Sequence, residues 1–156
     1  MINISQIIPE GYCLKCPGCC RFSQDRSAWA AHISSEEQQS LGIQDTIVPV
    51  QKNADTGQFV CSFFDAKSSK CAVYYKRPLE CRLYPFVINR KGNTVFLALD
   101  LNCPFARDHY ETQPMRDFIS ALTAACGSAG FLQYLNENPW LTQQYPDVLN
   151  VAALTK

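Results

Sequence analysis

The stretch CLKCPGCC, residues 13–20, places four cysteines within eight positions, and the last two are adjacent. Five more follow, so the chain of 156 residues carries nine cysteines. Lys15 and Gly18 lie between the thiols, which makes the stretch a polar loop rather than the apolar stripe of a packed helix. We therefore expect the bonds that these sulfur atoms form to determine the fold.

A disulfide framework explains this pattern poorly. Nine is an odd number, and a bridge between the neighbours Cys19 and Cys20 would be strained. Bridges within the first cluster would close very short loops, which gain little stability from a cross-link. The first ten residues, MINISQIIPE, have neither the basic start nor the small-residue cleavage site of a secretion signal. We therefore expect a cytoplasmic protein whose thiols are reduced.

The composition predicts a packed globular protein. Hydrophobic residues make up 47% of the chain, and 14 basic residues balance 14 acidic ones. The chain length is typical of one domain, which we predict over residues 1–156. The balanced charge gives no sign of a nucleic acid or an anionic membrane as a partner. No apolar run reaches the roughly 18 residues that a transmembrane helix needs.

Metal binding accounts for the cysteine spacing directly. Two residues between successive cysteines let the backbone curl so that both sulfur atoms face one ion. Cys126, by contrast, falls on the apolar face of a predicted helix and is expected to be a core residue. The other eight suit either two four-coordinate sites or one site with supporting cysteines. These candidate ligands are Cys13, Cys16, Cys19, Cys20, Cys61, Cys71, Cys81 and Cys103.

The sequence leaves two metals open. Sites made only of sulfur select zinc or iron–sulfur clusters. Zinc sites of this kind usually take a paired C-x-x-C motif from each of two hairpins, whereas here the later cysteines occur singly. Three close cysteines with a distant Cys103-Pro104 are typical of ferredoxin-type ligation of a 4Fe–4S cluster. This feature favours an iron–sulfur cluster, and zinc stays the alternative.

Two segments resemble the CxxCxxCC family, also called the YkgJ-type cysteine-cluster family of zinc- or iron-chelating proteins. They are CLKCPGCC and CAVYYKRPLECRLYPF, residues 71–86, with Cys61 between them. The resemblance runs from about Tyr12 to Cys103. It implies a cytoplasmic metal-chelating domain with the eight cysteines as expected ligands, and it names no reaction.

The second resembling segment also contains Arg77, Arg82 and Tyr84. Four thiolates around a divalent ion carry a net charge of about −2, which a nearby cation would offset. Both arginines suit that role, and salt bridges to Glu80 or Asp65 are the alternative. Tyr84 is expected to pack over the site and to limit its contact with solvent.

The hydrophobic pattern predicts an α+β fold, with a loop-rich metal-binding region over residues 12–104 and a helical tail over residues 114–156. Ser34 and Glu37 form a capping-box pattern with a stop signal at Gly42, which predicts a short helix between them. Residues 86–100 predict a hairpin that turns near Gly92. We further expect strands at residues 27–33, 45–51 and 57–65, helices at residues 77–84, 114–127 and 129–140, a possible further turn at residues 140–145, and Phe131 and Trp140 in the core.

Two functions fit these features. The first is a non-enzymatic metal-site module, which binds its metal for structure or storage and offers its surface to a partner protein. The second is a redox or protein-modifying enzyme built around an iron–sulfur cluster. The sequence contains no phosphate-binding loop, nucleophile elbow or recognisable pair of carboxylates. With eight thiols available, neither His32 nor His109 is needed as a ligand.

Overall fold

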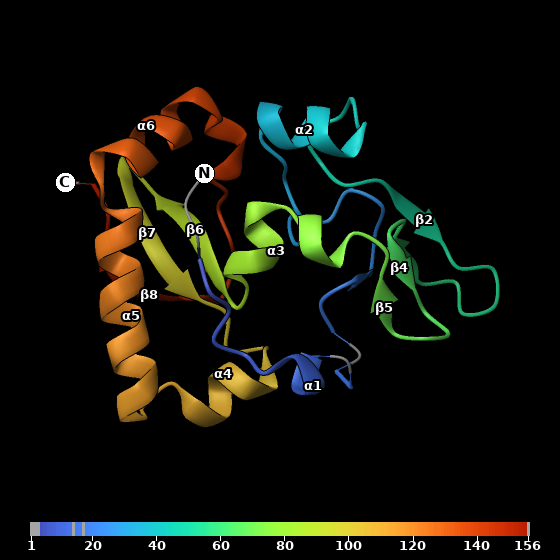
Figure 1. Cartoon of the computed structure of the whole chain (residues 1–156), viewed down its shortest axis with the longest axis horizontal. Coiled ribbons are helices and arrows are strands. Elements are labelled where there is room, and N and C mark those ends of the chain that lie inside the picture. Colours follow the sequence, from blue (N-terminus) through green and yellow to red (C-terminus); the bar gives the residue numbers. More distant parts are fainter. Residues whose placement is uncertain (1–3, 14, 17, 156) are drawn as a thin grey trace. The chain divides into compact units, whose positions relative to one another are not determined.

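The structure is a computed structural model that describes residues 4–13, 15–16 and 18–155. The described chain divides into two compact units, which are considered separately (Figure 1). We call residues 8–81 the cysteine unit, and residues 4–7 with 82–155 the sheet unit. Both combine helices with antiparallel strands, so the predicted α+β class is confirmed. The single domain over residues 1–156 stays a prediction.

The cysteine unit has short elements joined by long loops. Its strands are two or three residues long and form an antiparallel sheet in the order β1-β3-β2 and a separate pair, β4-β5. Strands this short contribute few ladder hydrogen bonds and bury little surface. The elements are α1 (Glu10–Cys13), β1 (Arg21–Phe22), α2 (Ser35–Leu41), β2 (Val50–Lys52), β3 (Phe59–Cys61), β4 (Phe64–Asp65), β5 (Lys70–Cys71), η1 (Tyr74–Lys76) and α3 (Leu79–Leu83), whose last two residues belong to the sheet unit.

Local sequence signals determine both ends of α2, as predicted. The Ser34 hydroxyl accepts the Glu37 N–H at 3.2 Å, and the Glu37 carboxylate accepts the Ser34 N–H at 2.9 Å. This reciprocal capping box satisfies two N–H groups that would otherwise lack a partner at the helix start. Gly42 ends the helix in the left-handed region, with φ 66°.

The strand predicted at residues 27–33 is wrong. The Ser27 hydroxyl accepts the Trp29 N–H at 3.2 Å, and the Ser27 carbonyl accepts the Ala30 N–H at 3.0 Å. These bonds turn the chain, because serine offers the backbone a local partner that competes with a strand ladder. Of this segment, His32 makes an isolated bridge to Ile47. The predicted strand at 45–51 begins only at Val50, and the one at 57–65 divides into β3 and β4.

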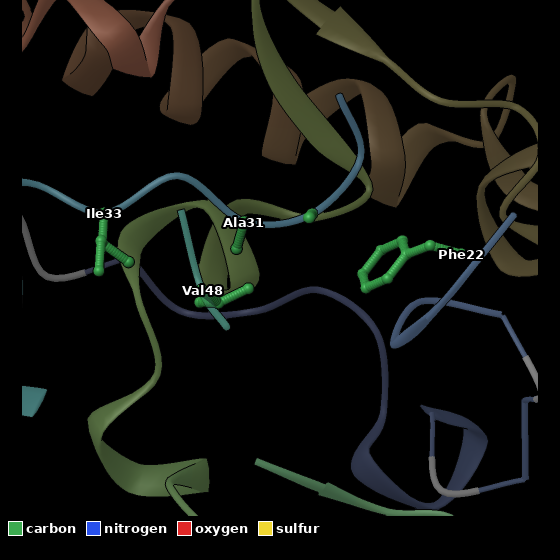
Figure 2. Close-up of a cluster of buried hydrophobic side chains, with 5 residues drawn as sticks. Phe22, Ala31, Ile33 and Val48 are labelled. Carbon is green, nitrogen blue, oxygen red and sulfur yellow. The ribbon is translucent and has the colours of Figure 1, made fainter. Parts of the chain in front are cut away.

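A small hydrophobic cluster forms the core of the cysteine unit. In Figure 2, Ala31 and Val48 face each other between Ile33 and Phe22. Ala30 completes the buried set, and partly buried side chains pack around it. Cys61 and Cys81 are among these, so the core fixes the surroundings of two candidate ligands. The others are Trp29, Leu41, Ile43, Ile47, Val50 and Phe59.

The sheet unit is built on the predicted hairpin. Thr94 lies opposite Lys91, and Gly92 takes up φ 61° in the turn between the two strands. A third strand that the sequence did not predict pairs antiparallel with β7 and completes the order β6-β7-β8. The elements are β6 (Phe86–Lys91), β7 (Thr94–Leu99), α4 (Pro104–His109), α5 (Gln113–Cys126), α6 (Ala129–Glu137), η2 (Pro139–Leu141) and β8 (Leu149–Ala153).

The two longest helices, α5 and α6, lie where the sequence predicts them. The Phe118 ring of α5 contacts the Phe86 ring of β6 with 5.7 Å between centroids, so α5 packs on this sheet (Figure 1). Cys126 is fully buried, which confirms it as a core residue. Phe131 is buried as predicted, whereas Trp140 is only partly buried.

Within residues 4–13, 15–16 and 18–155, no single helix is long and apolar enough to cross a membrane. Helices α5 and α6 reach the required length and composition only together, and a bend of 66° separates them.

Substitution of Gly42 tests the assignment of the α2 end. A Cβ added at Gly42 would meet no other atom within 4 Å, so any cost of Gly42→Ala comes from the positive φ. We expect a loss of about 1 kcal/mol in the free energy of unfolding, measured with urea. Gly42→Asn is the matched control and should lose less, because asparagine tolerates the left-handed region. Equal losses in the two variants would contradict this assignment.

Candidate metal centre

Four candidate ligands come together within the cysteine unit from four separate segments. Cys20 lies directly before β1, Cys61 ends β3, Cys71 ends β5 and Cys81 lies in the middle of α3. The Cys61 N–H donates to the Cys20 carbonyl at 3.0 Å, which fixes these two residues beside each other. Cys71, the third of these residues, is held by its pairing with Phe64 in the β4-β5 ladder.

These thiols lie close enough for a charge on one of them to raise the pKa of another. Burial raises the pKa of Cys20 to about 12, and the charges of Cys61 and Cys71 add to that rise. Burial also raises the pKa of Cys81 well above its usual value, and Cys20, Cys61 and Cys71 contribute to it. Burial is also the largest cause of the raised pKa of Cys61. A backbone hydrogen bond at Phe63 lowers this pKa, and the charge of Cys71 raises it further. Four thiolates here would repel one another, and a cation among them would remove that repulsion.

The donor set fits a metal ion, although the sulfur atoms do not surround one point as they stand. Cys20, Cys61, Cys71 and Cys81 carry free thiols. Four thiolates are the ligands that tetrahedral zinc and iron take from proteins. In the part of the chain that the structure describes, no three His, Cys, Asp or Glu side chains are arranged to hold an ion. Binding therefore requires the sulfur atoms to move to about 2.3 Å from the metal.

Two arginines place positive charge beside this cluster. The guanidinium groups of Arg21 and Arg77 both act to lower the pKa of Cys20. The Arg77 Nε donates to the Tyr74 carbonyl at 2.9 Å, and its guanidinium stacks on the Tyr74 ring at 3.8 Å. The guanidinium of Arg21 lies 4.6 Å from the centre of the Phe64 ring. These contacts hold both charges in place, where they would offset the negative charge of bound thiolates.

A comparison with protein families identifies the chain. The CxxCxxCC family model, described as "Putative zinc- or iron-chelating domain", matches residues 12–104, which is more than half of the chain. This chain belongs to the CxxCxxCC family. The resemblance stated from the two cysteine segments is therefore confirmed, and the family description supports a metal-binding role with zinc or iron. Comparisons with curated proteins and with solved structures give no match.

The other four predicted ligands of this CxxCxxCC protein are Cys13, Cys16, Cys19 and Cys103. Cys13 ends α1, and its carbonyl accepts the Cys16 N–H at 3.1 Å. Cys19 is exposed, in contrast to its neighbour Cys20. Cys103 belongs to the sheet unit, where it is buried as the residue before Pro104 at the start of α4. Their part in metal binding stays a prediction.

The two other predicted neighbours of the metal, Arg82 and Tyr84, belong to the sheet unit. The Tyr84 hydroxyl donates to Asp100 Oδ2 at 2.9 Å, and Asp100 Oδ1 accepts the Asn102 N–H at 2.9 Å. Tyr84 thus orders the loop that leads to Cys103. Arg21, which the sequence interpretation missed, takes a place beside Cys20; its only sequence signal is that it follows that cysteine.

The two histidines contact a carboxylate and a backbone carbonyl. His32 is buried, and its Nδ1 lies 3.4 Å from Glu80 Oε2. His109 Nδ1 lies 2.8 Å from the Phe105 carbonyl, and the two rings stack at 4.3 Å between centroids.

The raised thiol pKa values predict a loss of stability in alkali. Without metal, folding raises the pKa of Cys20 from 9.0 to about 12, chiefly because the thiol is removed from water. Because the folded-state pKa is raised, its contribution to stability is present below pH 9 and is lost as the pH rises towards 12. The free energy of unfolding of the metal-free protein should therefore fall over this range.

Cys20→Ala provides the control, since lysine and tyrosine also titrate in this range. Denaturant unfolding from pH 8 to 11 should show a shallower fall for the variant than for the original chain. Parallel curves for the two proteins would contradict the pKa assignment.

Proposed function

We propose that Cys20, Cys61, Cys71 and Cys81 bind one metal ion through four thiolates, and that this ion stabilises the cysteine unit. The observation that carries the proposal is that separate segments of the chain bring these cysteines together. The Cys61 N–H bonds to the Cys20 carbonyl, and Cys61 and Cys81 pack against the same hydrophobic cluster. The charges of Cys20, Cys61 and Cys71 also raise the pKa of Cys81, after burial as the largest cause. The family description supports the same chemistry. The protein is then a small metal-site module that works in the cytoplasm, where the thiols stay reduced.

The structure of the cysteine unit supports a stabilising role for the metal. Its strands have two or three residues, and its hydrophobic cluster contains five buried side chains, two of them alanines. Structural zinc contributes an apparent binding free energy of about 10 to 16 kcal/mol, whereas whole domains are stable by about 5 to 15 kcal/mol. A bound ion can therefore outweigh all other stabilising contributions in this unit.

We propose zinc as the ion at this site. All four positions are filled by protein sulfur atoms, which is typical of closed structural zinc sites. Such a site leaves no position open for substrate, so it favours a module over an enzyme. The balanced net charge fits a partner protein better than a nucleic acid or a membrane.

An iron–sulfur redox or protein-modifying enzyme is the second candidate. It is supported by the close spacing of Cys13, Cys16 and Cys19, and by the exposure of Cys19. An exposed thiol beside a cluster is what a substrate-facing or resolving cysteine requires. Cys103-Pro104, before α4, has the sequence form of a remote cluster ligand.

Serine substitution of each proposed ligand tests the assignment. Cys20→Ser, Cys61→Ser, Cys71→Ser and Cys81→Ser should each lose most of the bound metal and unfold at lower temperature, because a thiolate ligand is lost. Metal content by mass spectrometry and thermal unfolding measure the two effects. Cys126→Ser is the matched control: it should keep the metal, although a buried hydroxyl at this position costs about 1 to 3 kcal/mol of stability. Full metal content in all four ligand variants would exclude this site.

The colour of protein purified without oxygen separates the two candidate functions. We expect a colourless protein that contains about one zinc ion per chain, because zinc has a filled d shell. A brown protein whose visible absorbance is bleached by dithionite would contradict the choice of zinc and support the iron–sulfur enzyme.

A further inference from the structure

Glu37 connects two segments of the cysteine unit that lie far apart in sequence. Glu37 is buried, with 6% of the residue surface exposed. One carboxylate oxygen, Oε2, accepts the Ser34 N–H at 2.9 Å within the capping box of α2. The other, Oε1, accepts the N–H of Leu79, the first residue of α3, at 2.6 Å. The capping residue of one helix is therefore also the capping group of a second helix, the one that carries Cys81.

A second carboxylate joins the same two segments, and this one comes from α3. Glu80 Oε2 accepts the backbone N–H of His32 at 2.7 Å and lies 3.4 Å from the His32 Nδ1. Residues 32–37 and 79–80 are thus connected twice, once by a side chain from each segment. Cys81 follows immediately after this double connection.

Helix α3 needs such external support because it is short. It has five residues, too few for a helix to be stable on its own in water. The first N–H groups of any helix have no partner inside the helix, so the groups that accept them fix its start. A carboxylate is the strongest side-chain acceptor for such an N–H. The direction of the Cys81 side chain therefore depends on Glu37.

We infer that Glu37 is a positioning residue of the metal centre, which holds the first turn of α3 so that the Cys81 thiolate reaches the ion bound by the other three sulfur atoms. The inference rests on the four-thiolate site proposed above. It differs from a purely local role of Glu37 in capping α2. A local role affects the stability of that helix but leaves the number of sulfur ligands unchanged.

Cobalt(II) provides a readout that counts sulfur ligands. The intensity of sulfur-to-cobalt charge transfer, per bound ion, rises with the number of thiolates, and Cys81→Ser supplies the reference value for the loss of one. We expect the charge-transfer intensity of Glu37→Ala to fall to this reference value. The variant should also bind cobalt at least about 10-fold more weakly than the original chain, as is typical when a supporting group is removed.

Two control variants separate positioning from helix capping. Ser34→Ala removes the hydroxyl that caps α2 but leaves the bond from Leu79 to Glu37 in place. Glu36→Gln removes a neighbouring exposed carboxylate. Both should keep the charge-transfer intensity and the cobalt affinity of the original chain.

The outcomes are distinct. If Glu37→Ala keeps the intensity and affinity of the original chain, or if Ser34→Ala loses as much, Glu37 has no positioning role. If the original chain shows no sulfur-to-cobalt band, the four-thiolate site itself is wrong. If Glu37→Ala does not fold, Glu37→Gln decides by the same criteria, because its amide keeps the shape but can accept through one oxygen only.

Discussion

The repulsion that four neighbouring, half-buried thiolates would exert on one another is the constraint on which the cysteine unit depends. Burial raises the pKa of Cys20, Cys61 and Cys81, and the charges of neighbouring thiols add to each rise, so without an ion these three groups favour the neutral thiol. A divalent cation would reverse that preference and bind the four segments together. The strands of this unit are too short, and its hydrophobic cluster too small, to make such a connection unimportant.

The groups around the cluster are arranged in keeping with this constraint. Arg21 and Arg77 are held over aromatic rings beside Cys20, where their charges favour the thiolate. The hydrophobic cluster packs against Cys61 and Cys81. Adjacent cysteines differ sharply, since Cys19 is exposed whereas Cys20 faces the other thiols. The paired cysteines of the family motif therefore need not serve one ion.

Features set by nearby residues could be predicted from the sequence. The capping box of α2 depends on residues three apart, and the β6-β7 hairpin depends on its own turn, so both were predicted correctly. The strand at residues 27–33 was not formed, because the Ser27 hydroxyl turns the chain instead. Strand β8 was missed, since its pairing with β7 joins residues fifty or more positions apart.

The metal centre, too, could be predicted from the sequence only in part. The C-x-x-C spacing predicts metal binding by itself, and membership of the CxxCxxCC family supports it. Which four thiols gather is set by strand register and by the placement of α3, which no local pattern reports. The dual role of Glu37 is equally hidden, because the Leu79 N–H that it accepts lies 42 residues away.

X-ray absorption at the edge of the bound metal tests the account most directly, because it counts the atoms around the ion. For protein purified without oxygen, the account predicts four sulfur neighbours at about 2.3 Å and no second metal close by. A shell that contains nitrogen or oxygen, or an iron neighbour that indicates a cluster, would contradict a single ion held by four thiolates.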